Sequence, residues 1–211
     1  MPALLWNRAR NNAAPTLLLA HGAGAPMDSE FMEYTAAGLS ERGVHVARFE
    51  FPYMAQRRAD QRKRPPDRQP VLLASFAEAL AQAGDEGAVF IGGKSMGGRM
   101  ATLLAVERPL PGVVVLGYPF HPPGKPERLR VDHLAAMQAP CLVCQGERDA
   151  LGSREEVNSY ALPALIECCW LADGNHDFLP RKRSGASWQD NMTQAMDRVS
   201  DWIRARAAAL R

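Results

Sequence analysis

The chain has 211 residues, of which 46% are hydrophobic and 23% charged, proportions that are ordinary for a globular protein with a sizeable buried core. Its net charge of +2 is too small to favour nucleic acid or an anionic membrane surface as a partner. The apolar run at residues 16–20 is too short to cross a bilayer, and the N-terminus lacks the layout of a secretory signal. We expect a single domain of residues 1–211, located in the cytoplasm, with no nucleic-acid or membrane partner; the sequence leaves the oligomeric state open.

Apolar runs of strand length alternate with stretches of helical periodicity along the chain. The predicted strands are residues 3–6, 16–20, 44–49, 88–91, 112–117, 141–145 and 165–171. The predicted helices lie near residues 28–41, 70–83, 97–107, 132–138, 154–161 and 187–208. This alternation predicts an α/β fold, with a mostly parallel, doubly wound sheet covered by helices on both faces. In such a sheet the functional residues gather at the carboxyl ends of the strands.

Residues 56–69 interrupt this alternation. The segment contains six basic residues and two prolines and has no apolar periodicity, so we interpret it as a solvated loop. It follows the predicted strand at 44–49, on the edge of the sheet where we expect the site. A basic flap that favours anionic substrates or a partner is therefore the alternative hypothesis.

The stretch Gly93-Lys94-Ser95 allows two interpretations. A phosphate-binding loop, G-x-x-x-x-G-K-[ST], requires a glycine five positions before the glycine that precedes the lysine, and position 88 is alanine. Residues 88–91 are instead an apolar run typical of a strand, which cannot also curl around a phosphate. The spacing therefore disfavours nucleotide binding.

The same residues form the G-x-S-x-G pattern of a nucleophile turn, Gly93-Lys94-Ser95-Met96-Gly97. Such a turn needs a strand that runs into it and a helix that leaves it, and the predicted elements on either side fit this layout. The two glycines let the strand and the helix approach each other around a strained serine. We predict that Ser95 is a nucleophile; for the motif alone, a glycine-rich turn without catalytic function is the alternative.

A serine nucleophile needs a base that takes its proton and an acid that holds the base. His176 and Asp149 each lie just beyond the carboxyl end of a predicted strand. The chain order Ser95, Asp149, His176 is the order expected for hydrolases that use a G-x-S-x-G turn. Three nearby carboxylates are alternatives for the acid: Glu147, Asp173 and Asp177. We favour Asp149, because a residue adjacent to the histidine rarely reaches back to the imidazole with good geometry.

Acyl transfer also requires N–H donors for the oxyanion of the tetrahedral intermediate. One donor is expected from the residue after the nucleophile, Met96. Ala23, in the His21-Gly22-Ala23-Gly24 loop after the strand at 16–20, is the best-placed second donor, since the glycines beside it let the backbone approach a substrate. The alternative is a turn that needs glycine for its backbone alone.

The four cysteines do not form a recognisable metal or redox motif. Cys141 and Cys144 have C-x-x-C spacing, but they lie in a predicted strand, where residues three apart point to opposite faces. Cys168 and Cys169 are adjacent in a second strand, and no further C-x-x-C or histidine pair completes a zinc site. We interpret them as core residues.

The segments "HGAGAP", "GGKSMGG", "GERD" and "GNHDF" resemble, in order and spacing, the α/β-hydrolase superfamily from about residue 15 to the end of the chain. The sequence is most similar to small bacterial members related to dienelactone hydrolases and to a branch with similar "KSMGGR" turns. The resemblance implies Ser95 as nucleophile, Asp149 as acid, His176 as base, and Ala23 and Met96 as oxyanion donors. The better-known dienelactone hydrolases have cysteine in place of Ser95, so their lactone substrate is not implied here.

We therefore expect a serine hydrolase that acts on a small-molecule carboxylic ester or thioester and requires no metal or organic cofactor. Residues 118–140 separate two predicted strands at a point where many relatives insert a helical cap, and this interval is too short for one. A minimal, capless enzyme should prefer short acyl groups. Peptidase or amidase activity and a non-catalytic interaction protein of the same fold are the alternatives.

Overall fold

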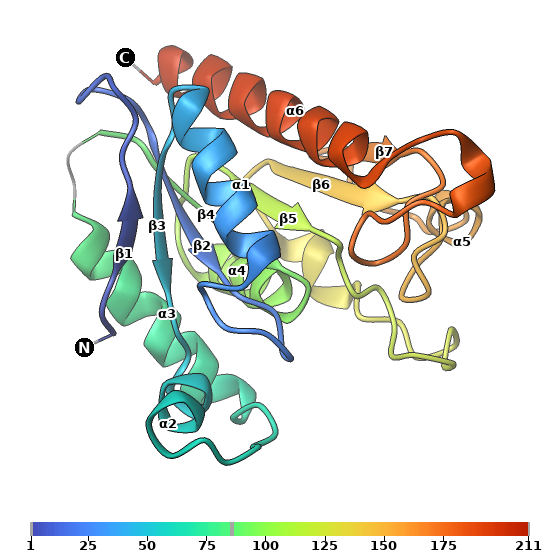
Figure 1. Ribbon diagram of the computed structural model, residues 1–211, viewed down its shortest axis with the longest axis horizontal. Helices are drawn as coiled ribbons and strands as arrows, with labels where there is room; N and C mark the ends of the chain where they lie inside the picture. The colour runs from blue at the N-terminus through green and yellow to red at the C-terminus, as the bar shows by residue number, and fades with distance from the viewer. Residues whose placement is uncertain (1, 85–86, 211) are drawn as a thin grey trace.

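The computed structural model describes residues 2–84 and 87–210, and Figure 1 shows a central sheet with helices packed on both of its faces. Within these residues the sheet has seven strands, in the order β1-β3-β2-β4-β5-β6-β7. The strands are β1 Leu5–Asn7, β2 Thr16–Ala20, β3 His45–Phe49, β4 Val89–Lys94, β5 Val113–Leu116, β6 Cys141–Gly146 and β7 Ile166–Leu171. All strand pairs are parallel except β1 with β3, so the predicted mostly parallel sheet is confirmed.

The strand order reverses between β2 and β4, because β3 lies on one side of β2 and β4 on the other. Ligands of open α/β sheets bind at such a reversal, outside the carboxyl ends of the strands. Ala20 at the end of β2 is paired with Gly93 near the end of β4. The loop that carries Ala23 and the turn that carries Ser95 therefore leave the sheet next to each other.

The helices divide between the two faces of the sheet. They are α1 Glu30–Glu41, α2 Pro52–Asp60, α3 Gln69–Ala83, α4 Met96–Glu107, α5 Arg154–Asn158 and α6 Trp188–Ala209, with 3-10 turns η1 Asp132–Ala136 and η2 Lys182–Ser184. One core cluster joins the sheet to α2, α3 and α4, and the other joins its opposite face to α1 and α6. Figure 1 shows α1 and α6 together on the near face, which confirms the doubly wound arrangement.

The apolar residues of helix α6 pack against the sheet as their spacing in the sequence predicts. Met192, Met196, Val199 and Ile203 recur every three or four residues and are all buried in the cluster beneath α1 and α6. Ser187 and Asp190 form a capping box that satisfies backbone N–H groups at the start of the helix. The predicted core-facing stripe is thus confirmed.

The interpretation of residues 56–69 as a loop is wrong for its first part. Residues 56–60 belong to α2, which begins with Pro52 in its first turn and buries Tyr53 and Met54. The helix was not predicted from the sequence because its buried residues, Tyr53 and Met54, come before the run of basic side chains. Charge pairing also reduces the excess of positive charge, because Arg58 pairs with Glu50 and Asp28. Residues 61–68 have no helix or strand, as expected of a loop.

Between β5 and β6 the described chain forms only a loop and the 3-10 turn η1. A helix was predicted at 132–138, and η1 covers the first five of these residues in the tighter geometry. No helical layer covers the carboxyl end of β5 from within this interval. The fold therefore has no helical cap inserted between β5 and β6, as the short length of this interval predicted.

The cysteines belong to the packing of the sheet. Cys141 is buried in the cluster beneath α3 and α4, and Cys144 in the cluster beneath α6, as their spacing predicts. Cys168 and Cys169 are half-buried, and all four thiols are free. Among the described residues, no group of three or more His, Cys, Asp or Glu side chains is placed to hold a metal ion. None of the helices in the same residues is both long and apolar enough to span a membrane.

Candidate active site

Ser95 stands alone between β4 and α4, with φ 51° and ψ −114°. A side chain in this region of backbone space is strained, and the surrounding packing must enforce it. The two glycines of the motif make that packing feasible. A Cβ on Gly93 would lie 2.5 Å from the backbone of Gly97, and one on Gly97 would lie 2.6 Å from the carbonyl oxygen of Ala20. Strand, turn and helix can approach this closely only with glycine at both positions.

A continuous chain of hydrogen bonds links three of the predicted residues. The Oγ of Ser95 lies 2.8 Å from Nε2 of His176, and Nδ1 of the same ring lies 2.7 Å from Oδ2 of Asp149. The three residues follow the carboxyl ends of β4, β6 and β7, and their side chains meet at this edge of the sheet. Asp149 is fully buried, whereas the His176 side chain is 25% exposed. The acid is thus shielded from water while the imidazole remains accessible to a substrate.

Asp149 is held by donors that keep its carboxylate oriented. Gln145 donates from Nε2 to Oδ2 at 2.9 Å, and the backbone N–H of Leu151 donates to Oδ1 at 2.8 Å. Gln145 was not among the predicted site residues. The signal that could have identified it is its position, since it is a polar residue at the end of an apolar strand and is fully buried.

The three alternative acids make other contacts. Glu147 pairs with Arg154, Asp173 pairs with Arg148 and Arg181, and Asp177 pairs with Lys94. The Arg181 guanidinium beside Asp173 holds the pKa of that carboxyl well below its usual range. Each of these carboxylates is engaged in an ion pair away from the imidazole nitrogens of His176.

Lys94 fastens the loop that carries the histidine. Its Nζ donates to the carbonyl oxygen of His176 at 2.7 Å and lies 3.1 Å from Oδ1 of Asp177. The side chain is 9% exposed, and burial lowers the pKa of its ammonium. The lysine that suggested a phosphate contact therefore points into the protein and ties β4 to the loop after β7.

The loop after β2 lies beside Ser95. A Cβ on Gly22 would lie 3.7 Å from the Cβ of Ser95, so this backbone passes beside the serine. Met96 is the first residue of α4, where backbone N–H groups have no intrahelical acceptor. Ala23 and Met96 thus come from the two loops that meet where the strand order reverses. Their roles as oxyanion donors remain predictions.

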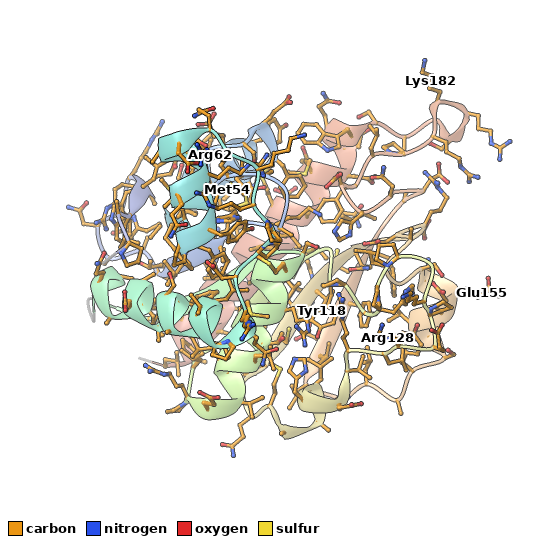
Figure 2. All side chains as sticks on the ribbon, turned by 90° about the horizontal axis from the view of Figure 1, so that it is seen from below. Met54, Arg62, Tyr118, Arg128, Glu155 and Lys182 are labelled. Atoms are coloured by element: carbon orange, nitrogen blue, oxygen red, sulfur yellow. The ribbon has the colours of Figure 1, made fainter. Side chains whose placement is uncertain are left out.

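Basic residues of α2 lie near the loop after β2. Figure 2, which views the molecule from below, shows Met54 on this helix with Arg62 close by, apart from Tyr118 and Arg128. Arg57 of α2 reaches toward the carbonyl oxygen of Gly24, with its Nη1 at 3.5 Å. The anionic-substrate hypothesis for the basic segment is not tested by these contacts and stays a prediction.

A hydroxyl, an imidazole and a buried carboxylate in this sequence of hydrogen bonds form the arrangement needed to activate a serine. The carboxylate accepts from one imidazole nitrogen, which leaves the other free to take the proton of the hydroxyl. The arrangement can support nucleophilic attack on a carbonyl carbon. In this arrangement the ring of His176 carries its hydrogen on Nδ1, toward Asp149, and Nε2 faces the hydroxyl of Ser95.

Comparison with known proteins agrees with this architecture. A family model described as alpha/beta hydrolase domain matches residues 13–204. Among solved structures, a protein of unknown function from Agrobacterium tumefaciens is 18% identical, with a TM-score of 0.73 and coverage of 98% of this chain and 93% of the other. A serine hydrolase without a lid from Xanthomonas campestris is 19% identical, with a TM-score of 0.68 and coverage of 94% and 88%.

A dienelactone hydrolase from Anabaena variabilis is 24% identical to this chain, with a TM-score of 0.66 and coverage of 94% of this chain and 90% of the other. At these identities the likeness concerns the fold. No curated protein matches the sequence.

Proposed function

This chain belongs to the alpha/beta hydrolase family, and from that premise we propose that it is a serine hydrolase that cleaves short carboxylic esters or thioesters. The observation that carries the proposal is the chain of hydrogen bonds from Ser95 through His176 to Asp149. The strained turn at Ser95 is a second support, because such backbone persists where the surrounding structure enforces it and is common at active sites.

In the acylation step, Nε2 of His176 takes the proton of Ser95 as Oγ attacks the carbonyl carbon of the substrate. The carbonyl π electrons move to oxygen, and the backbone N–H groups of Ala23 and Met96 stabilise the resulting oxyanion. Collapse of the tetrahedral intermediate breaks the bond to the leaving alkoxide or thiolate, which takes the proton from His176. Asp149 stabilises the imidazolium throughout and keeps Nδ1 protonated.

Deacylation repeats the same steps with water as the nucleophile. His176 removes a proton from water, the hydroxide adds to the acyl carbon, and the second tetrahedral intermediate expels Ser95, which regains its proton from the imidazolium. The products are a carboxylic acid and an alcohol or thiol. Every proton is transferred by His176, so the cycle needs no group beyond the chain and water.

The proposal is tested by the substitution Ser95→Ala, which should abolish labelling by a fluorophosphonate probe and lower ester turnover by several orders of magnitude. The variant should keep the wild-type circular dichroism spectrum, since only one hydroxyl is lost. Wild-type protein that is folded but neither labelled nor active would instead favour a non-catalytic interaction protein. Magnesium-dependent ATP binding that is lost in Lys94→Ala would revive the phosphate-loop interpretation and contradict ours.

A further inference from the structure

Tyr53, on α2, is in contact with the loop that borders the nucleophile. Its side chain is 1% exposed, and its hydroxyl donates to the carbonyl oxygen of Ala23 at 2.9 Å. The carbonyl oxygen of Gly22 lies farther from the same hydroxyl, at 3.4 Å. A buried phenol needs a partner wherever it lies, so burial alone would not distinguish a structural role from a functional one.

His21 holds the same loop from the same side. Its Nε2 accepts from the backbone N–H of Phe51 at 3.1 Å, which leaves the ring proton on Nδ1. Nδ1 in turn donates to the carbonyl oxygen of Gly22 at 2.7 Å. Burial lowers the pKa of His21, in keeping with a neutral ring that uses both nitrogens in this way. The carbonyl oxygens on both sides of Ala23 are thus anchored.

These anchors determine the direction of one N–H group. In a trans peptide the C=O and the N–H point in opposite directions, so fixing the Gly22 carbonyl also fixes the N–H of Ala23. The hydroxyl of Tyr53 fixes the next peptide plane, through the carbonyl of Ala23. Two fixed planes leave φ and ψ of Ala23 no freedom. Because the Gly22 carbonyl is held toward His21, the N–H of Ala23 is directed away from that ring. The Gly22 backbone passes beside Lys94 and Ser95.

We propose that Tyr53 is a positioning residue for the oxyanion hole, holding the 22–24 loop so that the N–H of Ala23 is presented to the substrate carbonyl. The inference rests on the proposed serine hydrolase function. It also gives α2 a role, because this helix brings the phenol beneath the loop. The backbone N–H of Tyr53 donates to Oδ2 of Asp67 at 2.9 Å, which secures the start of the helix. Burial raises the pKa of the phenol, so it remains a donor at ordinary assay pH.

The test is Tyr53→Phe, which removes the donor and keeps the ring. Complete loss of an oxyanion donor costs about 10²–10³ in kcat, so loosening one donor should lower kcat by about tenfold. KM for p-nitrophenyl butyrate should stay within about twofold, because the loss appears in the transition state. The inhibition constant of phenylboronic acid, whose tetrahedral adduct with Ser95 places an oxygen in the same hole, should rise in parallel with the loss of kcat.

Tyr118→Phe is the matched control. Tyr118 is also 1% exposed, and its hydroxyl donates to a backbone carbonyl, that of Arg130, at 2.8 Å. Tyr118→Phe should lower the unfolding midpoint about as much as Tyr53→Phe does. It should leave kcat and the inhibition constant of phenylboronic acid near their wild-type values. Equal kinetic losses in both variants, or a rise in KM with unchanged kcat in Tyr53→Phe, would overturn the proposal.

Two further measurements separate the remaining outcomes. Introducing 4-aminophenylalanine at position 53 restores a donor at the para position and should recover most of the lost kcat; no recovery would count against the inference. If Tyr53→Phe does not fold, a crystal structure of the wild-type phenylboronate adduct decides, since an adduct oxygen out of reach of the Ala23 N–H would refute the inference. Wild-type protein that neither cleaves esters nor binds phenylboronic acid would contradict the proposed function itself.

Discussion

At the scale of single residues, Asp149 illustrates how a side chain is selected by position rather than by type. Four carboxylates were candidates for the acid, and among them only Asp149 combines full burial with a hydrogen bond to the ring. Gln145 and the N–H of Leu151 donate to the two oxygens of the same carboxylate, so it is held in one orientation. A fixed acid is what keeps the proton of the imidazole on Nδ1.

Asp149→Asn should lower kcat by about 10⁴, by analogy with the same change in serine proteases. The amide can donate to Nδ1, which stabilises the tautomer that carries its proton on Nε2 and cannot accept from Ser95. Ester turnover by purified variants provides the measurement, with Asp177→Asn as the comparison. Asp177→Asn weakens only the ion pair with Lys94 and should cost less than tenfold. The assignment is wrong if the order of the two effects is reversed.

At the scale of secondary structure, the sequence was most informative where one pattern repeats over several residues. The buried parallel strands and the stripe of α6 were predicted from runs of apolar residues, and their bounds shift by only a few positions. The three candidate residues that the structure brings together were predicted because acyl-transfer chemistry requires them at strand ends in a given order. Ser95, Asp149 and His176 were therefore predictable without any contact being known.

Contacts that depend on tertiary packing were not predictable. The short strand β1 pairs antiparallel with β3, although its sequence does not state a partner or a direction. Helix α2 was missed because two apolar residues, Tyr53 and Met54, anchor a helix whose later turns are basic. Lys94 was noticed for the wrong reason, since only the folded chain shows that its ammonium reaches the carbonyl of His176.

The interval between β5 and β6 leads to a prediction about substrates. A loop and a 3-10 turn cannot enclose a long acyl chain, so carbons beyond the first few stay in water and gain none of the roughly 0.8 kcal/mol expected per buried CH₂. We expect kcat/KM for p-nitrophenyl acetate or butyrate to exceed that for the decanoate, with no jump in activity when micelles form. A series that rises toward the decanoate would show that α2 and residues 61–68 close over the site as a lid.

At the scale of the whole molecule, the buried His21 and the half-buried His133 connect stability to pH. Burial lowers the pKa of His21, and burial together with the nearby Arg99 guanidinium lowers the pKa of His133 to about 4, while Asp132 opposes this shift. Nε2 of His133, in η1, lies 2.9 Å from Oγ1 of Thr102, in α4, so the contact joins the two elements. Both rings are neutral in the folded protein at neutral pH and ionise more readily when the chain unfolds.

Below about pH 6.5 the unfolded chain therefore binds more protons than the folded one, and stability falls with pH from there toward pH 4. Urea denaturation at pH 7, 6 and 5 should show a declining free energy of unfolding. His133→Gln keeps a polar contact to Thr102 but does not titrate. In this variant the free energy of unfolding should depend less steeply on pH, by an amount that corresponds to up to about one proton. An unchanged slope in this variant would mean that other groups cause the decline.

The left-handed turn at Ser95 has a consequence for how this sequence can evolve. Strain of this kind costs about 1–3 kcal/mol, and glycine would relieve it because glycine tolerates positive φ. Natural proteins lie close to the stability they need, so a gain of this size is accessible by one substitution. Selection for activity must therefore act continuously to retain serine at position 95. In a descendant released from that selection, we expect drift toward glycine here before the glycines at 93 and 97 are lost.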